Sequence, residues 1–427
     1  FCTDGIVYAD RTLSPKIQEV KQLYSNVRIQ VREKCIIIEN RNLFADLEAF
    51  TFEERVEKDG QQIALRKLDI HAEPGTRTET AREKLPGDPG EYTVTVTARL
   101  KEDNRYADAG HEVAFGQGVF QIEACQREEQ TQKKARYGTF HVIYGDVNIG
   151  VQGEGFSALF SRSEGGIISL VYGGKEYITR TPKLTFYRAL TDNDRGMGAA
   201  YRDSGWLAAS MGMRYVPESF QVAEEPESLQ ITMEYEAKYP EVFRCTVTYR
   251  MAADGKLEMM IAYPGIRCEE YLPLFGIDFK MKKELRSFSY YGYGPEENYA
   301  DRMCGARLGV FYTSADKNLS QYLIPQECGN REGVRWLKLL NQEGEGLRFC
   351  AEGAPFAASV LPYSAYELEN ALHADELPVS RYTWVRLMAA QTGVGGDDSW
   401  GAPVHEEYRI PASKPLKLHF SVAPVRA

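Results

Sequence analysis

Short runs of alternating apolar and polar residues, separated by glycine-containing turns, recur along most of the chain and predict a β-rich fold. From residue 141 to the end these runs continue almost without interruption, and only residues 203–213 are typical of a short helix. A single β-domain of this length exceeds an ordinary sandwich, so we expect a large, many-stranded double sheet. Clear examples of the runs are residues 243–251, 257–263 and 416–422.

The first residues predict one helix. Ser14 can cap it and Pro15 suits its first turn, while Ile17, Val20 and Tyr24 fall on one face. The helix is followed by shorter strand-like runs.

Asp59 and Gly60 lie between two of these runs and predict a hairpin, because glycine tolerates a positive φ. Residues 35–38 read as a short buried strand, and residues 92–97 as a half-buried one. Strands at this spacing predict a small immunoglobulin-like sandwich.

At 427 residues the chain is long enough for two domains. Residues 127–140 are polar and lack apolar periodicity, which predicts a linker. The expected organisation is therefore a leading segment, an immunoglobulin-like sandwich, the linker and a large β-domain, at residues 1–25, 26–126, 127–140 and 141–427.

Charge and cysteine content exclude several classes of function. A net charge of -10 disfavours nucleic acid as a partner, and no apolar run approaches the ~20 residues that span a bilayer. The eight cysteines form no CxxC motif, which favours reduced thiols and a cytoplasmic location. The chain begins without methionine or a signal-peptide core, which suggests a fragment, a mature product or a trimmed chain.

Three acidic segments are candidate sites. Residues 191–196, TDNDRG, resemble the start of a calcium loop, but Arg195 occupies a ligand position, so a buried polar turn is favoured. The adjacent pairs Glu296/Glu297 and Asp397/Asp398 point apart on extended backbone and do not suit a glycosidase acid–nucleophile pair. We expect them to form structural hydrogen bonds or ion pairs.

The most distinctive stretch is residues 393–401, in which three glycines and two aspartates precede Trp400. The glycines permit a tight, unusual backbone, and an indole can cover the C–H face of a sugar ring. Sugar stacking and ordinary packing are equally compatible with the pattern. No histidine, serine or phosphate-binding motif completes a catalytic site.

Four segments together resemble bacterial β-galactosidases of glycoside hydrolase family two. Residues 1–12 resemble the segment that leaves the catalytic TIM barrel of these enzymes. Signatures of their large C-terminal domain resemble residues 188–194, residues 292–302 and the loop that ends at Trp400. These segments follow one another in order, so the resemblance covers essentially the whole chain.

The resemblance implies a mainly β fold: a second immunoglobulin-like domain, then a β-supersandwich similar to galactose mutarotase. Residues 1–25 would be the exit segment of the barrel and a connecting helix. The family's catalytic glutamates would precede Phe1, so no catalytic residue is assigned in this chain. The parent reaction would be retaining hydrolysis of terminal β-D-galactosides such as lactose.

Site residues and partners follow from the same resemblance. Trp400 matches a tryptophan that contributes an aromatic wall to the active site. Phe1 and Asp4 match positions near a sodium site, where Asp4 replaces an asparagine. No cofactor is expected in this chain alone, whereas sodium and magnesium suit the complete enzyme. Expected partners are the β-galactoside, the catalytic barrel in cis or in a partner chain, and further copies in an oligomer.

From about Tyr137 the chain also resembles the small subunit of split β-galactosidases. A separate accessory or carbohydrate-binding subunit of a two-chain enzyme is therefore the alternative. A sugar epimerase and a structural oligomerisation domain also stay open, although the six histidines offer no compelling acid–base pair.

Overall fold

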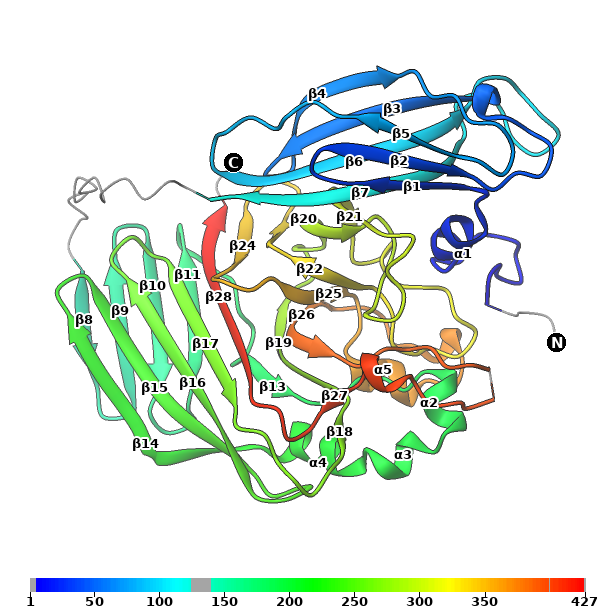
Figure 1. Cartoon of the computed structure of the whole chain (residues 1–427). Helices are drawn as coiled ribbons and strands as arrows, with labels where there is room; N and C mark the ends of the chain where they lie inside the picture. The colour runs from blue at the N-terminus through cyan, green and yellow to red at the C-terminus, as the bar shows by residue number, and fades with distance from the viewer. Residues whose placement is uncertain (1–4, 124–139, 399, 426–427) are drawn as a thin grey trace. The chain divides into compact units, whose positions relative to one another are not determined.

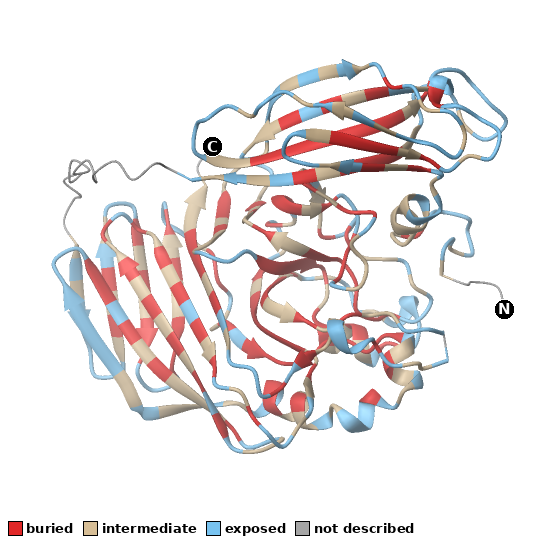
Figure 2. Cartoon of the chain, viewed as in Figure 1, coloured by how far each residue is buried: buried red, intermediate tan, exposed pale blue. Residues whose placement is uncertain are grey.

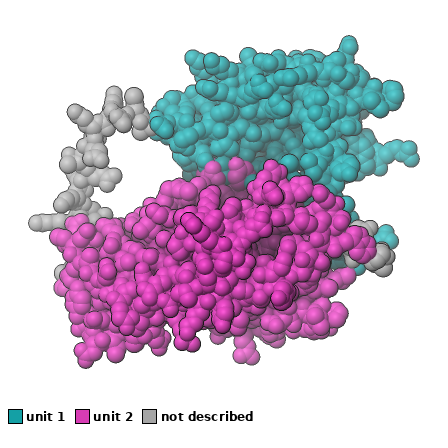
Figure 3. Space-filling view, turned by 60° about the horizontal axis from the view of Figure 1, so that its bottom comes forward, with its two compact units in different colours: residues 1–134, 294–296, 303–310 teal, residues 135–293, 297–302, 311–427 magenta. Residues whose placement is uncertain are grey.

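The computed structural model describes residues 5–123, 140–398 and 400–425 and divides the chain into two compact units. Unit 1 comprises Phe1–Lys134, Gly294–Glu296 and Met303–Val310; unit 2 comprises Ala135–Tyr293, Glu297–Arg302 and Phe311–Ala427 (Figure 3). The predicted linker, 127–140, lies outside the described residues except for Phe140. Both units are built mainly of strands, so the predicted fold class is confirmed.

Unit 1 contains the predicted helix, α1 (Ile17–Tyr24), but the predicted cap is wrong. Lys16 occupies the cap position without a side-chain hydrogen bond. The Ser14 hydroxyl instead donates to the carbonyls of Gly5 and Ile6, at 2.6 and 2.9 Å. Tyr24 is 83% exposed, so the apolar face of the helix does not extend to it.

Seven strands of unit 1 form a three-stranded sheet, β1-β2-β5, and a four-stranded sheet, β4-β3-β6-β7 (Figure 1). Apolar side chains from both sheets share one core, as in an immunoglobulin-like sandwich. The elements are β1 (Val27–Val31), β2 (Cys35–Asn40), η1 (Leu47–Ala49), β3 (Phe50–Lys58), β4 (Gln61–Leu68), β5 (Arg77–Ala81), β6 (Gly90–Leu100) and β7 (Glu112–Ile122).

The predicted hairpin is confirmed, with Asp59 and Gly60 at φ values of +50° and +78° between β3 and β4. The half-buried prediction for residues 92–97 is wrong, because β6 is a central strand and all six residues are buried. Its threonine face has polar partners. The Thr95 hydroxyl accepts from Gln117 Nε2 at 2.8 Å, and the same amide donates to the Leu308 carbonyl.

Unit 2 is the large, many-stranded structure that the sequence predicts. Its sheets have the orders β14-β15-β16-β17-β28-β24-β23-β20-β21, β12-β11-β10-β9-β8 and β13-β19-β26-β25-β22 (Figure 1). A short pair, β18-β27, lies outside them.

The first strands of this part of the chain are β8 (His141–Tyr144), β9 (Asn148–Gly153), β10 (Phe156–Ser161), β11 (Ile167–Tyr172), β12 (Lys175–Glu176), β13 (Lys183–Thr185), β14 (Arg214–Glu225), β15 (Ser228–Ala237), β16 (Phe243–Ala252), β17 (Leu257–Tyr263) and β18 (Tyr271–Leu272). The later strands are β19 (Leu274–Lys282), β20 (Ser287–Gly294), β21 (Arg307–Ser314), β22 (Asn330–Val334), β23 (Trp336–Leu340), β24 (Gly346–Ala351), β25 (Phe356–Leu361), β26 (Tyr382–Gln391), β27 (Ile410–Pro411) and β28 (Leu416–Val425).

Helices of unit 2 are short, and among the described residues no helix is long and apolar enough to cross a membrane. The predicted helix at 203–213 is confirmed as α4, whose Trp206 is buried. The helices are α2 (Asp192–Gly196), α3 (Ala199–Arg202), α4 (Ser204–Gly212), α5 (Ala365–Asn370), η2 (Ala374–Glu376) and η3 (Glu406–Tyr408).

One hydrophobic core joins the three large sheets of unit 2. Figure 2 shows buried residues, in red, recurring along the strands of these sheets. Phe160 of β10 meets Tyr249 of β16 edge-on at 5.5 Å between ring centres. Phe279 of β19 meets Phe349 of β24 at 5.3 Å. The nine-stranded sheet therefore shares its apolar face with both five-stranded sheets, which confirms the double-layer prediction.

Candidate functional site

Trp400 lies on the long segment between β26 and β27 in unit 2, and 74% of its surface is exposed. Burial of a tryptophan side chain is strongly favourable, so exposure on this scale is unusual for a residue whose only role is packing. Three sets of contacts, each called a brace below, hold the loop.

The first brace is a buried ion pair. Arg188 and Asp194 are held by two hydrogen bonds, at 3.2 and 3.0 Å. The same guanidinium donates to the carbonyls of Thr392 and Gly393, at 2.5 and 2.9 Å. Burial alone would lower the pKa of Arg188, but the charge and hydrogen bonds of Asp194 raise it above its ordinary value. Arg188 therefore stays charged while it fixes the start of the loop.

The segment that resembled a calcium loop forms this brace instead. Thr191 and Asp194 make a reciprocal capping box at the start of α2, so both carboxylate oxygens of Asp194 bind protein donors. The preference for a buried polar turn is confirmed for Asp194, which is 5% exposed.

Asp301 provides the second brace. Its Oδ2 accepts from the backbone N–H of Gly395 at 2.6 Å. A Cβ added to Gly393 would lie 2.5 Å from the same carboxyl group. Gly393, Gly395 and Gly396 do not have positive φ. Gly393 is needed because the Asp301 carboxyl approaches it closely.

The third brace is at the other end of the loop. Gly401 has φ +111°, and a Cβ there would lie 2.4 Å from the backbone of Gly196 at the end of α2. Asn193 Nδ2 donates to the Asp398 carbonyl at 3.3 Å. The end of α2 and the loop therefore pack backbone to backbone.

Both aspartates before Trp400 have structural partners, as predicted. Asp398 Oδ1 accepts from the backbone N–H groups of Trp400 and Ala402, at 2.8 and 3.1 Å, and these bonds lower the pKa of Asp398. Asp397 Oδ1 lies 2.7 Å from His405 Nε2.

The structural prediction for Glu297 is also confirmed. This carboxylate is 2% exposed and accepts from Arg302 at 2.6 Å, from the Ser320 and Tyr322 hydroxyls and from the Gly329 N–H. Burial opposes its ionisation, but the charge of Arg302 and the other donors outweigh burial and lower the pKa of Glu297. Glu296 is exposed.

Three segments that the sequence singled out therefore converge at one loop: residues 188–194, Asp301 within residues 292–302, and residues 393–401. The bracing roles of Arg188 and Asp301 were not predicted, because their loop partners lie 205 and 94 residues away. Phe1 and Asp4, the predicted sodium ligands, lie outside the described residues. Within the described ranges, no group of three or more His, Cys, Asp or Glu side chains is placed to hold a metal ion.

Comparison with protein families decides the affiliation of the chain. Residues 152–422 match the family described as β-galactosidase small chain, and residues 36–121 match β-galactosidase domain 4. The chain belongs to the β-galactosidase small-chain family. A β-galactosidase small subunit from Latilactobacillus sakei is 35% identical over 310 residues, which cover 66% of this chain and 97% of the relative.

Longer members of the wider group are similar over the whole chain. A β-galactosidase from Halalkalibacterium halodurans is 40% identical over 99% of this chain and 42% of its own length. One from Streptococcus thermophilus is 39% identical over 100% of this chain and 41% of its own length. The chain thus spans about two fifths of the length of these two β-galactosidases.

Solved structures resemble the chain only weakly. A galactose mutarotase-related enzyme from Lactobacillus acidophilus has a TM-score of 0.36 at 12% identity, over 67% of this chain and 98% of that protein. A putative aldose 1-epimerase from Escherichia coli K12 has a TM-score of 0.34 at 12% identity, over 68% and 99%. Scores this low carry no functional argument.

Proposed function

We propose that the chain is the non-catalytic C-terminal part of a retaining β-galactosidase of glycoside hydrolase family two and presents Trp400 to the sugar. The complete enzyme would hydrolyse terminal β-D-galactosides such as lactose. The observation that carries the proposal is the exposed indole on a loop braced by Arg188, Asp301 and Gly401. A fixed aromatic face suits stacking on the C–H face of a pyranose.

The acidic groups near the loop support a role outside bond cleavage. Asp194, Asp301 and Asp398 each accept backbone or guanidinium donors that position the loop. A retaining glycosidase needs two carboxyl groups about 5 Å apart on either side of the scissile bond. We therefore assign the catalytic carboxylates to a barrel that lies outside these residues.

The catalytic barrel could belong to the same polypeptide or to a partner chain. Full-length coverage by the longer relatives favours one polypeptide, whereas the small-subunit relative favours a two-chain enzyme. In either arrangement the proposed partners are the barrel, the β-galactoside and further copies in an oligomer.

The proposed compartment is the cytoplasm, and the proposed ions are sodium, near Phe1 and Asp4, and magnesium in the complete enzyme. All six cysteines in the described part of the chain are free thiols, which suits a reducing compartment. Six free thiols together are uncommon in secreted proteins, where disulfides form.

The decisive experiment is Trp400→Ala in the enzyme assembled with its catalytic part, assayed on lactose and a chromogenic galactoside. We expect KM to rise by about tenfold, which corresponds to about 1.4 kcal/mol of lost sugar binding. Trp400→Phe, which keeps an aromatic face, should recover most of the loss. Tyr239→Ala is the control, because Tyr239 is 62% exposed and belongs to a different turn.

Unchanged kinetics in Trp400→Ala would mean that the indole has no contact with substrate. The 427-residue chain alone is expected to show no turnover of a chromogenic galactoside. Turnover that copurifies with the chain through successive columns would contradict the non-catalytic assignment.

A further inference from the structure

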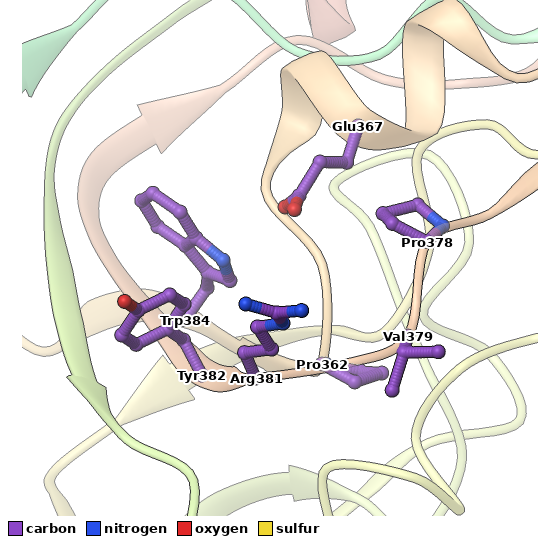
Figure 4. Close-up of a pocket in the computed structure, with 7 residues that line it drawn as sticks. All are labelled: Pro362, Glu367, Pro378, Val379, Arg381, Tyr382 and Trp384. Carbon is purple, nitrogen blue, oxygen red and sulfur yellow. The ribbon is translucent and has the colours of Figure 1, made fainter.

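A pocket in unit 2, separate from the Trp400 loop, has the composition of a small-molecule site. It has a volume of about 310 Å³ and lies between α5 and the start of β26 (Figure 4). Small-molecule sites range from about 300 to 1,000 Å³, so this one suits a ligand of one ring. None of its residues belongs to the Trp400 loop.

Two aromatic side chains form one wall of the pocket. Tyr382 and Trp384 are two residues apart on β26 and therefore face the same side of the strand. Each ring makes a cation–π contact. Lys280 Nζ lies 3.7 Å from the Tyr382 ring centre, and the Arg180 guanidinium lies 4.8 Å from the Trp384 ring centre. Lys280 Nζ also lies 5.6 Å from the Trp384 ring centre, and neither Lys280 nor Arg180 lines the pocket.

Opposite charges face each other across the pocket. Figure 4 shows the Arg381 guanidinium and the Glu367 carboxylate directed toward one another from different elements. No ion pair between them exists among the described residues. Glu367 Oε2 accepts from the N–H and hydroxyl of Ser364, at 2.7 and 2.8 Å, whereas no hydrogen bond to Oε1 forms within the described chain.

This arrangement discriminates among ligand classes. A guanidinium offers only donors and a carboxylate only acceptors, and both are presented to one small space. An anion attracted by Arg381 is repelled by Glu367, and the reverse holds for a cation, so a net charge on the ligand gains little here. A neutral ligand with adjacent hydroxyl groups can accept from Arg381, donate to Glu367 and place its apolar face against the aromatic wall.

We propose that this pocket binds one hexopyranose residue, either a free sugar or the end of a glycan. The pyranose C–H face lies on Tyr382 and Trp384, while neighbouring hydroxyls bridge Arg381 and Glu367. Val379, which is 80% exposed, lies at the pocket. This site is independent of the role proposed for Trp400 and needs no catalytic barrel.

The test is calorimetric titration of the full chain with methyl β-D-galactopyranoside and methyl β-D-glucopyranoside. We expect a Kd of about 5 mM for at least one of them, as for a small site with few polar contacts. Arg381→Ala should weaken binding by about fivefold, since one charged donor contributes about 1 kcal/mol. Arg381 is exposed, so this variant should fold.

Two further variants separate the possible outcomes. Glu367→Gln should also weaken binding, and it retains a residue type that completes a capping box with Ser364. Tyr239→Ala, at an exposed residue outside both sites, should leave the affinity unchanged. The loss of affinity in Arg381→Ala is measured on the chain alone, whereas the Trp400 proposal is tested by KM in the assembled enzyme, so the two proposals fail separately. The proposal is overturned if the folded chain binds neither glycoside up to about 50 mM. The proposal is also overturned if Arg381→Ala and Glu367→Gln both bind the glycosides as tightly as the unaltered chain. Tighter binding of acetate than of the glycosides would overturn it as well.

Discussion

Two neighbouring glutamates show how strongly context determines the contribution of a side chain. Glu297 is buried among donors that include Arg302, whereas Glu296 is exposed. Glu297→Ala should lower the free energy of unfolding by about 3–5 kcal/mol, because it leaves the Arg302 charge buried without its carboxylate. Glu296→Ala should change it by less than about 0.5 kcal/mol. Urea denaturation of both variants measures the difference, and equal effects would contradict the argument.

A partly buried carboxyl, that of Glu332, predicts a pH dependence. Burial, assisted by the charge of Asp301, raises the pKa of Glu332 from 4.5 to about 7, although a hydrogen bond from Asn330 opposes the shift. Because the folded-state pKa exceeds the unfolded one, this group stabilises the fold fully below pH 4.5 and loses that contribution as pH rises through 7. Glu332→Gln should therefore reduce the loss of stability between pH 5 and 8 by on the order of 1–3 kcal/mol.

Thermal unfolding at several pH values tests the role of Glu332. Glu343→Gln is the matched control, because Glu343 is exposed and should not alter the profile. If both variants follow the wild-type profile, Glu332 is not the group responsible.

Residue-scale predictions from sequence succeeded where local geometry decides. Adjacent carboxylates on extended backbone point apart, which correctly predicted structural roles for Glu297, Asp397 and Asp398. The Ser14 cap failed because its hydroxyl reached carbonyls eight and nine residues earlier in the chain. A capping motif does not reveal such competing acceptors.

At the scale of the element, the Trp400 loop depends on close backbone contact at Gly401. Gly401→Ala adds both the strain of a positive φ and a Cβ only 2.4 Å from the Gly196 backbone, so the loop has to move. We expect the assembled enzyme to lose galactoside affinity in the same direction as Trp400→Ala. Steady-state kinetics and acrylamide quenching of tryptophan fluorescence report the displacement.

Gly353→Ala separates the effect of backbone strain at positive φ from the effect of a steric clash of the added Cβ. Gly353 has a similar φ, +102°, but a Cβ there meets nothing within 4 Å. It should cost about 1 kcal/mol of stability and leave KM unchanged. If Gly401→Ala also left KM unchanged, close packing against α2 would not position Trp400.

Elements encoded by neighbouring residues were predictable, whereas those defined by distant partners were not. The Asp59–Gly60 hairpin was predictable because these two residue types favour the positive φ values that its turn requires. The alternation in residues 92–97 concealed a fully buried strand, because the residues that cover the threonine face include Gln117 and Leu308. Residues 301 and 395 are likewise joined only by the fold.

At the scale of the whole molecule, strand period and length predicted the many-stranded architecture but not its strand order. The last strand, β28, pairs with β17 through partners such as Leu257 and Val422. Hydrophobic period sets which face is buried, whereas the choice of neighbour depends on packing over the entire unit. The pocket of Figure 4 was not predicted, because its lining depends on how α5 and β26 pack in the folded unit.

The division into units leads to a last prediction, because residues 303–310 belong with unit 1 although unit 2 surrounds them in sequence. Arg307 pairs with Glu112 at 2.8 Å and lies 4.6 Å from the Phe115 ring centre. Residues 152–422 match the small-chain family on their own, so a chain of residues 141–427 should fold cooperatively. In the full chain, Arg307→Ala should cost about 1 kcal/mol.

In the shortened chain the same substitution should cost less than about 0.5 kcal/mol, because Glu112 and Phe115 are no longer present. The test is urea denaturation of the full chain and the shortened chain, each with and without Arg307→Ala. The quantity compared is the free energy of unfolding. An equal cost in both chains would show that Arg307 acts within unit 2. Failure of residues 141–427 to unfold cooperatively would show that the large core requires the sandwich residues for its own stability.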